Sequence, residues 1–553
     1  MNLGIDFGST YTVLSAYDAT TGQVDAIEHN NSTNIPSVVS HRGSDPQLHW
    51  EYGVLAKKNT GKKDREIFKA FKMLLPENNE QILQERGYTQ YSPADITARF
   101  LDNCLTTGLQ KFKEEKIEHL VICAPEIWSA AIHTADGRPI LRDICKKFPY
   151  VNTVQVVSEP AAASAFFAFN FEKNAGRPFD GHILLVDYGG GTLDITLTKV
   201  YNRGDGRVEI KVLKRNGAGE NENGRVGQAG VAYMEDVVTQ AILRAGLDPK
   251  EHPTKFLRAV DELEDQLRCR ATEIQGYFDM MGLDDPGISE DLFVDDLEYN
   301  GEELAVSYGD LVSSYQKVIQ PVLQEKLKFI TDYMDKKRIS YSDKAGEDFK
   351  IACVGGFGTY YLVEHQINSI FHFAAMDGRR TNIINAVQER ERAVSYGAAL
   401  ISSGVISIKC TAPYSVGIYA KRADGKVSRN FAISLRQDIE YGHPYFQCFD
   451  NGEKMIFFVP NGAISSLIIN TGADLQGTIR APIRDEFRER LQNLVTGMYK
   501  AAHVGFSLDQ SEVLSIHVEE YDFVHNQVGQ TRVIELSRFN DLLATSVIEL
   551  VGD

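Results

Sequence analysis

The stretch Ile183-Leu-Leu-Val-Asp-Tyr-Gly-Gly-Gly-Thr-Leu-Asp-Ile-Thr-Leu-Thr-Lys199 decides the fold of this chain. A run of branched apolar residues, the carboxylate of Asp187 and three glycines predict a buried strand that turns sharply into a second strand. Successive glycines leave no Cβ above the turn, so its amide N–H groups can converge on an anion. The alternative is a glycine-rich hairpin with one capping aspartate. The choice depends on whether the chain supplies partners for this turn.

The same pattern occurs near the N-terminus, in Leu3-Gly-Ile-Asp-Phe-Gly-Ser-Thr-Tyr-Thr-Val-Leu-Ser15. Both copies have an apolar residue, an aspartate, an aromatic residue, a glycine and a hydroxyl residue in the same order. If the two hairpins face each other, their turns can hold a polyphosphate from both sides. Asp6 and Asp187 would then hold a magnesium ion through its waters. A repeated structural hairpin without a ligand is the alternative.

Hydrophobic periodicity predicts the elements around these hairpins. We expect helices over 66–75, 93–113, 256–273, 308–334 and 389–402, and core strands at 120–124 and 154–157. Ser158-Glu-Pro-Ala-Ala-Ala163 follows the second of these strands and predicts a helix with proline in its first turn. Glu159 is therefore a candidate for orienting water or a metal. A carboxylate that merely favours the positive end of the helix dipole is the alternative.

Composition limits the class of protein. The 553 residues are 43% apolar and 24% charged, which predicts a soluble globular protein with several domain-sized units. The formal net charge of -18 argues against general affinity for nucleic acid or anionic membranes. Seven scattered cysteines without a Cys-x-x-Cys favour reduced, mostly buried thiols and a cytoplasmic location. We expect neither a secretory signal nor a membrane-spanning segment.

The chain resembles the actin, hexokinase and heat-shock-protein-70 superfamily, and within it the heat-shock-70 (DnaK-like) chaperones. Five blocks carry the resemblance in the family's order: Ile5-Asp-Phe-Gly-Ser-Thr-Tyr11, Ser158-Glu-Pro-Ala-Ala-Ala163, Val186-Asp-Tyr-Gly-Gly-Gly-Thr-Leu-Asp194, Val354-Gly-Gly-Phe-Gly358 and Arg392-Ala-Val-Ser-Tyr-Gly-Ala-Ala399. The resemblance implies an α/β fold. An actin-like two-lobed ATPase domain, built of duplicated ribonuclease-H-like halves, would be followed by a β-rich C-terminal domain.

The resemblance also implies domain boundaries. The nucleotide-binding domain is expected over 1–403, with lobe I at about 1–182, lobe II at about 183–380 and a closing helix at about 386–403. An apolar interdomain linker would occupy 404–411, although so short a stretch is also typical of a strand. A β-sandwich-like substrate-binding or partner-binding domain is expected over 412–553, with strands at 456–459, 466–469 and 513–518. A helical insertion is predicted at about 484–502, and the family's helical lid is expected to be missing.

Individual roles follow from matching the family's motifs. Asp6 and Asp187 would hold magnesium through waters, and Glu159 and Asp194 would order the metal shell and the attacking water. Lys72 aligns with the family lysine that supports this water, and Lys69 is the second choice. The catalytic set is therefore Lys72, Glu159, Asp187 and Asp194. The nucleotide is expected to contact Gly8, Ser9, Thr10, Tyr11, Gly189, Gly190, Gly191, Thr192, Gly227, Gly355, Gly356 and Phe357.

Two departures from the family concern the end that would hold the base. Where the chaperones have basic residues that clamp the adenosine, this chain has Glu264 and Asp265, with Arg268 a turn later. After Gly355-Gly356 it has Phe357-Gly-Thr359, where the chaperones carry a serine and then an adenine-stacking arginine. This Gly-Gly-Phe is similar to the divergent heat-shock protein 12 type branch.

The resemblance implies a slow ATPase that uses ATP/ADP and Mg²⁺, with K⁺ as a further candidate cation. Nucleotide state would control the binding of a polypeptide segment by the C-terminal domain, with J-domain-type or nucleotide-exchange co-chaperones as partners and no role for nucleic acid or membrane. One alternative is a nucleotide-dependent scaffold or regulator that binds one specific folded partner. Another is a small-molecule kinase of the superfamily, which the lack of a sugar-binding block disfavours.

Overall fold

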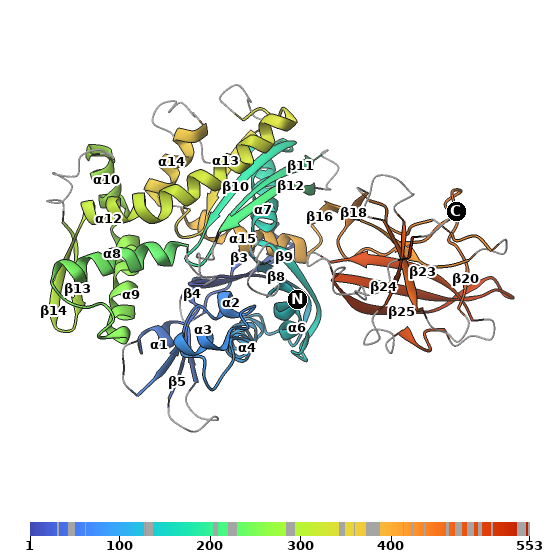
Figure 1. Ribbon diagram of the computed structural model, residues 1–553, viewed down its shortest axis with the longest axis horizontal. Coiled ribbons are helices and arrows are strands. Elements are labelled where there is room, and N and C mark those ends of the chain that lie inside the picture. The colour runs from blue at the N-terminus through green and yellow to red at the C-terminus, as the bar shows by residue number, and fades with distance from the viewer. Residues whose placement is uncertain are drawn as a thin grey trace. The chain divides into compact units, whose positions relative to one another are not determined.

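The computed structural model describes residues 1–553 with gaps at 30–31, 43–49, 61, 63, 126–127, 129–136, 203–207, 219–228, 282, 284–292, 342–348, 359, 372–386, 413, 422–424, 429, 436, 460–463, 471–477, 484–490, 496–499, 510–512, 539–548 and 551–553. The chain divides into two compact units, Met1–Ile406 and Ser407–Asp553. Figure 1 labels their helices and strands. Each unit contains its own hydrophobic core.

The first sheet of Met1–Ile406 is built on the N-terminal hairpin. Strands β1 (Asn2–Phe7) and β2 (Tyr11–Asp18) pair antiparallel, and β1 also pairs parallel with β8 (Ile117–Ala124). The sheet order is β3-β2-β1-β8-β9, with β4 joined to β2; the added strands are β3 (Gln23–Ala26), β4 (Ile35–Pro36) and β9 (Val151–Ser158). The turn of the hairpin therefore follows directly from the central strand.

The second sheet repeats this arrangement around the tri-glycine hairpin. Strands β10 (Gly181–Tyr188) and β11 (Leu193–Asn202) pair antiparallel, and β10 pairs parallel with β15 (Phe349–Val354). Strand β12 (Val208–Ala218) continues the sheet beyond β11. The predicted strand–turn–strand at 183–199 is confirmed, and so is the copy at 3–15. In each sheet, a hairpin is joined by a third strand parallel to its first.

Helices α7 (Glu159–Ala175) and α15 (Val387–Ser402) pack against each other and against the two sheets (Figure 1). A Cβ atom added to Gly397 of α15 would lie 1.6 Å from the carbonyl oxygen of Ala162, so glycine allows the two helix backbones to touch. Helix α15 also packs on β1 and β2, and Ser395 accepts a 2.9 Å hydrogen bond from Ser15 of β2. These contacts tie the helix to the first hairpin.

The remaining helices of this unit surround the sheets. They are α1 (Val54–Lys57), α2 (Phe71–Leu74), α3 (Glu80–Glu85), α4 (Pro93–Phe112), α6 (Gly137–Lys146), α8 (Gly230–Arg244), α9 (Pro253–Cys269), α10 (Ala271–Met281), α12 (Tyr308–Ser314), α13 (Gln320–Lys337) and α14 (Tyr361–Phe371). A π-helical turn, Tyr315–Ile319, joins α12 to α13. Two small sheets complete the unit: β5 (Val39–His41) with β6 (Trp50–Tyr52) and β7 (Glu66–Phe68), and β13 (Phe293–Tyr299) with β14 (Glu302–Ser307).

Most sequence-based elements are confirmed, but the helix predicted over 66–75 is wrong. Glu66–Phe68 instead forms β7, which pairs with β5, and only Phe71–Leu74 is helical. Ala70 separates the two with φ of 56°, a left-handed conformation that interrupts a helix. The helix predicted over 256–273 ends earlier, at Cys269, and α10 starts after Arg270.

The unit Ser407–Asp553 is formed mainly of strands. One sheet has the order β17-β21-β22-β26, formed by Ser415–Ile418, Ser466–Asn470, Ile479–Pro482 and Glu549–Leu550. The other contains β19 (Tyr445–Phe446), β20 (Phe457–Phe458), β23 (Ala501–Leu508), β24 (Val513–Asp522) and β25 (Gln527–Arg538). Apolar side chains of both sheets, among them Val416, Ile469 and Phe506, share one core.

Two predictions for the C-terminal part need correction. The segment 404–411, expected as a linker, contains strand β16 (Ile406–Thr411), which pairs antiparallel with β18 (Asp438–Glu440). The helix predicted over 484–502 lies partly outside the described residues, and its last two residues belong to β23. The cysteines for which the structure gives a state are free thiols, and Cys104, Cys123, Cys145 and Cys353 are buried. Among the described helices, none is both long and apolar enough to cross a membrane.

Candidate functional site

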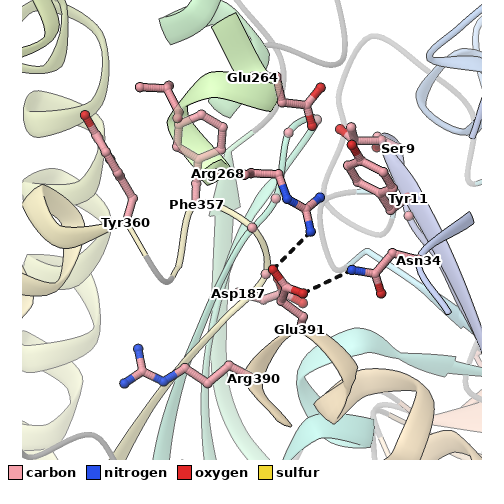
Figure 2. Close-up of a pocket in the computed structure, with 18 of the residues that line it drawn as sticks. Ser9, Tyr11, Asn34, Asp187, Glu264, Arg268, Phe357, Tyr360, Arg390 and Glu391 are labelled. Carbon is pink, nitrogen blue, oxygen red and sulfur yellow. Dashed lines mark hydrogen bonds and ion pairs between the residues drawn. The ribbon is translucent and has the colours of Figure 1, made fainter. Parts of the chain in front are cut away.

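A cavity of about 730 Å³ opens in Met1–Ile406 where the two hairpin turns meet (Figure 2). Most of the residues predicted to bind nucleotide or metal line it: Asp6, Gly8, Ser9, Thr10, Tyr11, Lys72, Glu159, Asp187, Gly189, Gly190, Gly191, Thr192, Gly355, Gly356 and Phe357. These residues come from five separate segments of the chain. Their roles stay predictions, but the fold brings them to one place.

The two hairpin turns touch across the cavity. A Cβ atom added to Gly190 would lie 2.3 Å from Oγ1 of Thr10, and one added to Gly191 would lie 2.4 Å from Oγ of Ser9. Only residues without a side chain can therefore stand opposite these hydroxyl groups. The tri-glycine sequence is explained by this close approach, which brings the backbone of one turn next to two hydroxyl groups of the other.

Two carboxylates lie at the ends of the central strands. Burial raises the pKa of Asp6 to about 7, with a further increase from the nearby charge of Glu159. The pKa of Asp187 is also raised well above its usual value by burial, by Glu159 and by Asp6. Lys72 opposes both shifts. Buried carboxylates this close to each other are costly unless a cation compensates them, so the cluster is suited to binding a positive ion.

Lys72, rather than Lys69, is the lysine of this cavity. Its ammonium group forms a buried ion pair with Glu159, the first residue of α7. Burial alone would lower the pKa of Lys72, but Glu159, Asp6 and Asp187 together raise it. Lys69 instead forms an ion pair with Asp261 of α9. Lys72, the first choice from the sequence, therefore lines the cavity. Lys69, the second choice, is paired with Asp261 and does not line it.

The third glycine segment closes one side of the site. Gly355 follows β15 with φ of 78°, and a Cβ atom on it would lie 2.5 Å from Oδ1 of Asp187. The N–H groups of Phe357 and Gly358 both donate to the carbonyl oxygen of Tyr188, at 2.9 and 3.0 Å. The segment is therefore fixed against the end of β10, beside the carboxylate of Asp187.

Two predicted residues do not line the cavity. Asp194 is completely buried and stands directly opposite Asp187 in the β10–β11 ladder. Gly227 lies outside the described residues, as does Thr359.

A group of interactions that the sequence reasoning missed connects three elements at the open side. Figure 2 shows Arg268 of α9 reaching Glu391 of α15, which also accepts a hydrogen bond from Asn34. The donor–acceptor distances are 3.2 and 3.0 Å. The guanidinium group of Arg268 lies 4.5 Å from the ring centre of Tyr11, within range of a cation–π interaction.

A buried ion pair between Arg390 of α15 and Glu364 of α14 was also missed. Both residues line the cavity. The alternating charges in Glu389-Arg-Glu-Arg392 were the available signal, but such a run usually marks a solvated helix face. Lys57 was also missed; its ammonium group lies 3.2 Å from the hydroxyl of Tyr11 and 2.8 Å from Asp265.

Comparison with known proteins agrees with this arrangement of motifs. Residues 2–224, which include the first two hairpins and α7, match the family model described as Hsp70 protein. The chain is similar to "Chaperone protein DnaK" of Stenotrophomonas maltophilia (strain R551-3), with 24% identity over 289 residues, 47% of this chain and 41% of that protein. It is also similar to "Heat shock 70-related protein 1, mitochondrial" of Leishmania major, with 26% identity over 223 residues, 36% of this chain and 32% of that protein.

The cavity thus brings together glycine turns, carboxylates and a buried lysine. Together with the family match, this arrangement makes residues 2–224 similar to Hsp70 proteins. The match spans less than half of either relative.

Proposed function

We propose that this protein binds ATP with Mg²⁺ in the cavity, hydrolyses it slowly to ADP and phosphate, and acts as a chaperone of the heat-shock-70 type. In this proposal, the two sheets of Met1–Ile406 are the two lobes of an actin-like ATPase. The contact of Gly190 with Thr10 and of Gly191 with Ser9 carries the proposal. Two backbone turns that meet at hydroxyl groups can hold a polyphosphate from opposite sides.

The carboxylates support a divalent cation at this site. Asp187 is buried and Asp6 is half-buried, and the pKa values of both are raised, first by burial and then by the neighbouring negative charge of Glu159. A bound Mg²⁺ would neutralise part of the charge of the phosphates and would hold several of its own waters. Among the described residues, no group of three or more His, Cys, Asp or Glu is arranged to hold a metal directly. The proposal therefore relies on two carboxylates acting through water, and K⁺ stays a further candidate.

Lys72 and Glu159 are proposed to position the attacking water. Their ion pair places an ammonium group and a carboxylate together at the buried floor of the cavity. The ammonium group can stabilise charge on the phosphate, and the carboxylate can accept a hydrogen bond from water. Phosphoryl transfer depends mostly on such positioning and charge stabilisation, so these side chains suffice for slow hydrolysis.

The unit Ser407–Asp553 is proposed to bind a polypeptide segment. A groove of about 770 Å³ runs beside β19, and Phe431, Tyr445, Phe446 and Phe449 contribute aromatic side chains to it. Its Lys454 lies 3.6 Å from the ring centre of Phe446. Aromatic side chains next to a strand edge suit an extended apolar segment. J-domain-type or nucleotide-exchange co-chaperones are proposed partners, and a cytoplasmic location stays a prediction.

The decisive experiment measures ATP turnover by the full chain and by Asp187→Ala, with and without an unfolded peptide. We expect slow, Mg²⁺-dependent turnover that Asp187→Ala abolishes and that peptide stimulates. Turnover that survives Asp187→Ala would contradict the site. Stoichiometric phosphorylation of a sugar would instead identify a small-molecule kinase.

A further inference from the structure

One end of the cavity carries several aromatic and apolar side chains. Phe357, Tyr360 and Tyr361 line it from the segment that leads into α14, and Leu267 and Ile274 line it from α9 and α10. Figure 2 shows Phe357 and Tyr360 on the side of the site opposite Ser9, Tyr11 and Asn34. A phosphate needs polar partners, whereas a flat ring gains from apolar walls. This end therefore fits the base of the nucleotide.

The ring of Phe357 packs against three tyrosine rings. Its centre lies 6.1 Å from that of Tyr188, 5.7 Å from that of Tyr233 and 5.9 Å from that of Tyr360. A Cβ atom on Gly230 would lie 2.2 Å from Cδ2 of Phe357, so the ring edge presses against the start of α8. Phe357 itself remains half-buried and lines the cavity. It is a supported aromatic platform rather than a mobile surface ring.

The two arginines that line the cavity have acidic partners, and the polar side chains of Thr272 and Gln275 in α10 also line it. Arg390 is paired with Glu364, and Arg268 is paired with Glu391 and stacked on Tyr11. The hydroxyl of Tyr361 donates to Asp279 at 2.9 Å. Reading the edge of a base requires donors and acceptors aimed at it, whereas stacking requires only a π-face.

We propose that Phe357 is the platform on which the nucleotide base stacks, and that this stack makes the site favour purine over pyrimidine nucleotides. This inference rests on the proposed nucleotide site and assigns its base specificity. Stacking depends on ring area, so pyrimidine nucleotides bind more weakly than purine nucleotides.

Binding measurements by isothermal titration calorimetry on the full chain test this role. The ligands are ATP, GTP, CTP and inorganic tripolyphosphate, each with Mg²⁺. The variants are Phe357→Ala, Phe357→Leu, which keeps apolar volume without a π-face, and Phe357→Tyr, which keeps the ring. Phe458→Ala in β20 serves as the control. The side chain of Phe458 is 63% exposed and belongs to the other unit, Ser407–Asp553. Circular dichroism establishes that each variant is folded.

We expect Phe357→Ala and Phe357→Leu to weaken ATP and GTP by about 5- to 100-fold, as loss of one base–aromatic stack predicts. Affinity for tripolyphosphate should not change, and Phe357→Tyr should retain most of the affinity for ATP. Equal losses for ATP and tripolyphosphate, no loss in Phe357→Leu, or binding of CTP as tight as that of ATP by the unmodified protein would overturn the inference. Failure of the unmodified protein to bind either ATP or tripolyphosphate would overturn the proposed nucleotide site itself.

Discussion

The ammonium group of Lys72 forms an ion pair with the carboxylate of Glu159, and the two side chains are only 3% and 6% exposed. The pair joins α2 to the first turn of α7 and stands next to Asp6 and Asp187. Four charged groups thus share one buried region. Stability and function of the site are expected to depend on the balance of these charges.

Replacement of Lys72 by methionine should destabilise the protein strongly, because Glu159 would remain buried without its partner. Loss of one member of a buried pair typically costs about 3–5 kcal/mol of unfolding free energy. The double variant Lys72→Met, Glu159→Gln should recover much of this loss. Urea unfolding of the first unit measures both effects. Lys69→Met is the matched control: its pair with Asp261 is more exposed and should contribute about 1 kcal/mol or less. Equal losses in both lysine variants would contradict the special position of Lys72.

Replacement of Gly190 by alanine should weaken binding of ATP and of tripolyphosphate at least about tenfold, because the new methyl group would overlap Oγ1 of Thr10 and push the turns apart. Thr10→Ala in the same chain should restore part of the affinity by removing the overlapping atom. Calorimetric titration of the single and double variants measures the coupling. Gly276→Ala in α10, where a Cβ atom would meet nothing within 4 Å, serves as the control. Additive effects of the two substitutions would show that the turns do not act together.

Replacement of Asp187 by asparagine should lower ATP turnover without lowering the stability of the protein. The substitution removes one of the buried like charges, so the protein without nucleotide should unfold at the same temperature or a few degrees higher. ATP turnover should fall by at least about 100-fold, because the proposed magnesium site loses a carboxylate. Differential scanning calorimetry and a phosphate-release assay measure the two quantities. A large loss of thermal stability would indicate a structural role for Asp187 instead.

Glu264 should make stability depend on pH. Burial raises its pKa from 4.5 to about 7, and the charges facing it belong to Lys57, Asp261, Asp265 and Arg268. Between these two values the folded state retains a proton that the unfolded state has released, so stability falls as pH rises through this window. Because Glu264 is only partly buried, the loss between pH 5 and pH 8 should be on the order of 1 kcal/mol.

Glu264→Gln should remove this part of the pH dependence. Chemical unfolding of both proteins at pH 5 and pH 8 gives the comparison. The difference in unfolding free energy between Glu264→Gln and the unmodified protein should be larger at pH 8 than at pH 5. An identical difference at both pH values would refute the assigned shift.

The two hairpins could be predicted because their signals are local. In each copy, a buried apolar strand, an aspartate and a glycine turn occupy fewer than ten consecutive residues. Hydrophobic periodicity and turn residues are therefore enough to predict the motif. The helix predicted over 66–75 was wrong because pairing of Glu66–Phe68 with β5 outweighed its helical spacing. Strand pairing depends on a partner that lies elsewhere in the chain, and local periodicity does not contain this information.

The candidate site was only partly predictable for the same reason. Asp6, Asp187 and the glycines stand in repeated motifs, but nothing near Lys72 indicates that its partner is Glu159, 87 positions away. The pairs Arg268–Glu391 and Arg390–Glu364 join helices that are far apart in the sequence. In the sequence alone, such charges are typical of solvated helix faces, and only the folded structure shows that they pair.

The sequence by itself determined the two strand–turn–strand motifs, the carboxylates that follow their first strands and the aromatic departure at Phe357. The tertiary structure decided that Gly190 and Gly191 face Thr10 and Ser9, that Lys72 rather than Lys69 enters the cavity, and that Phe357 is backed by tyrosines. The physical reason is range: turns and strands follow from neighbouring residues, whereas a binding site requires distant segments to pack at a few ångströms from one another.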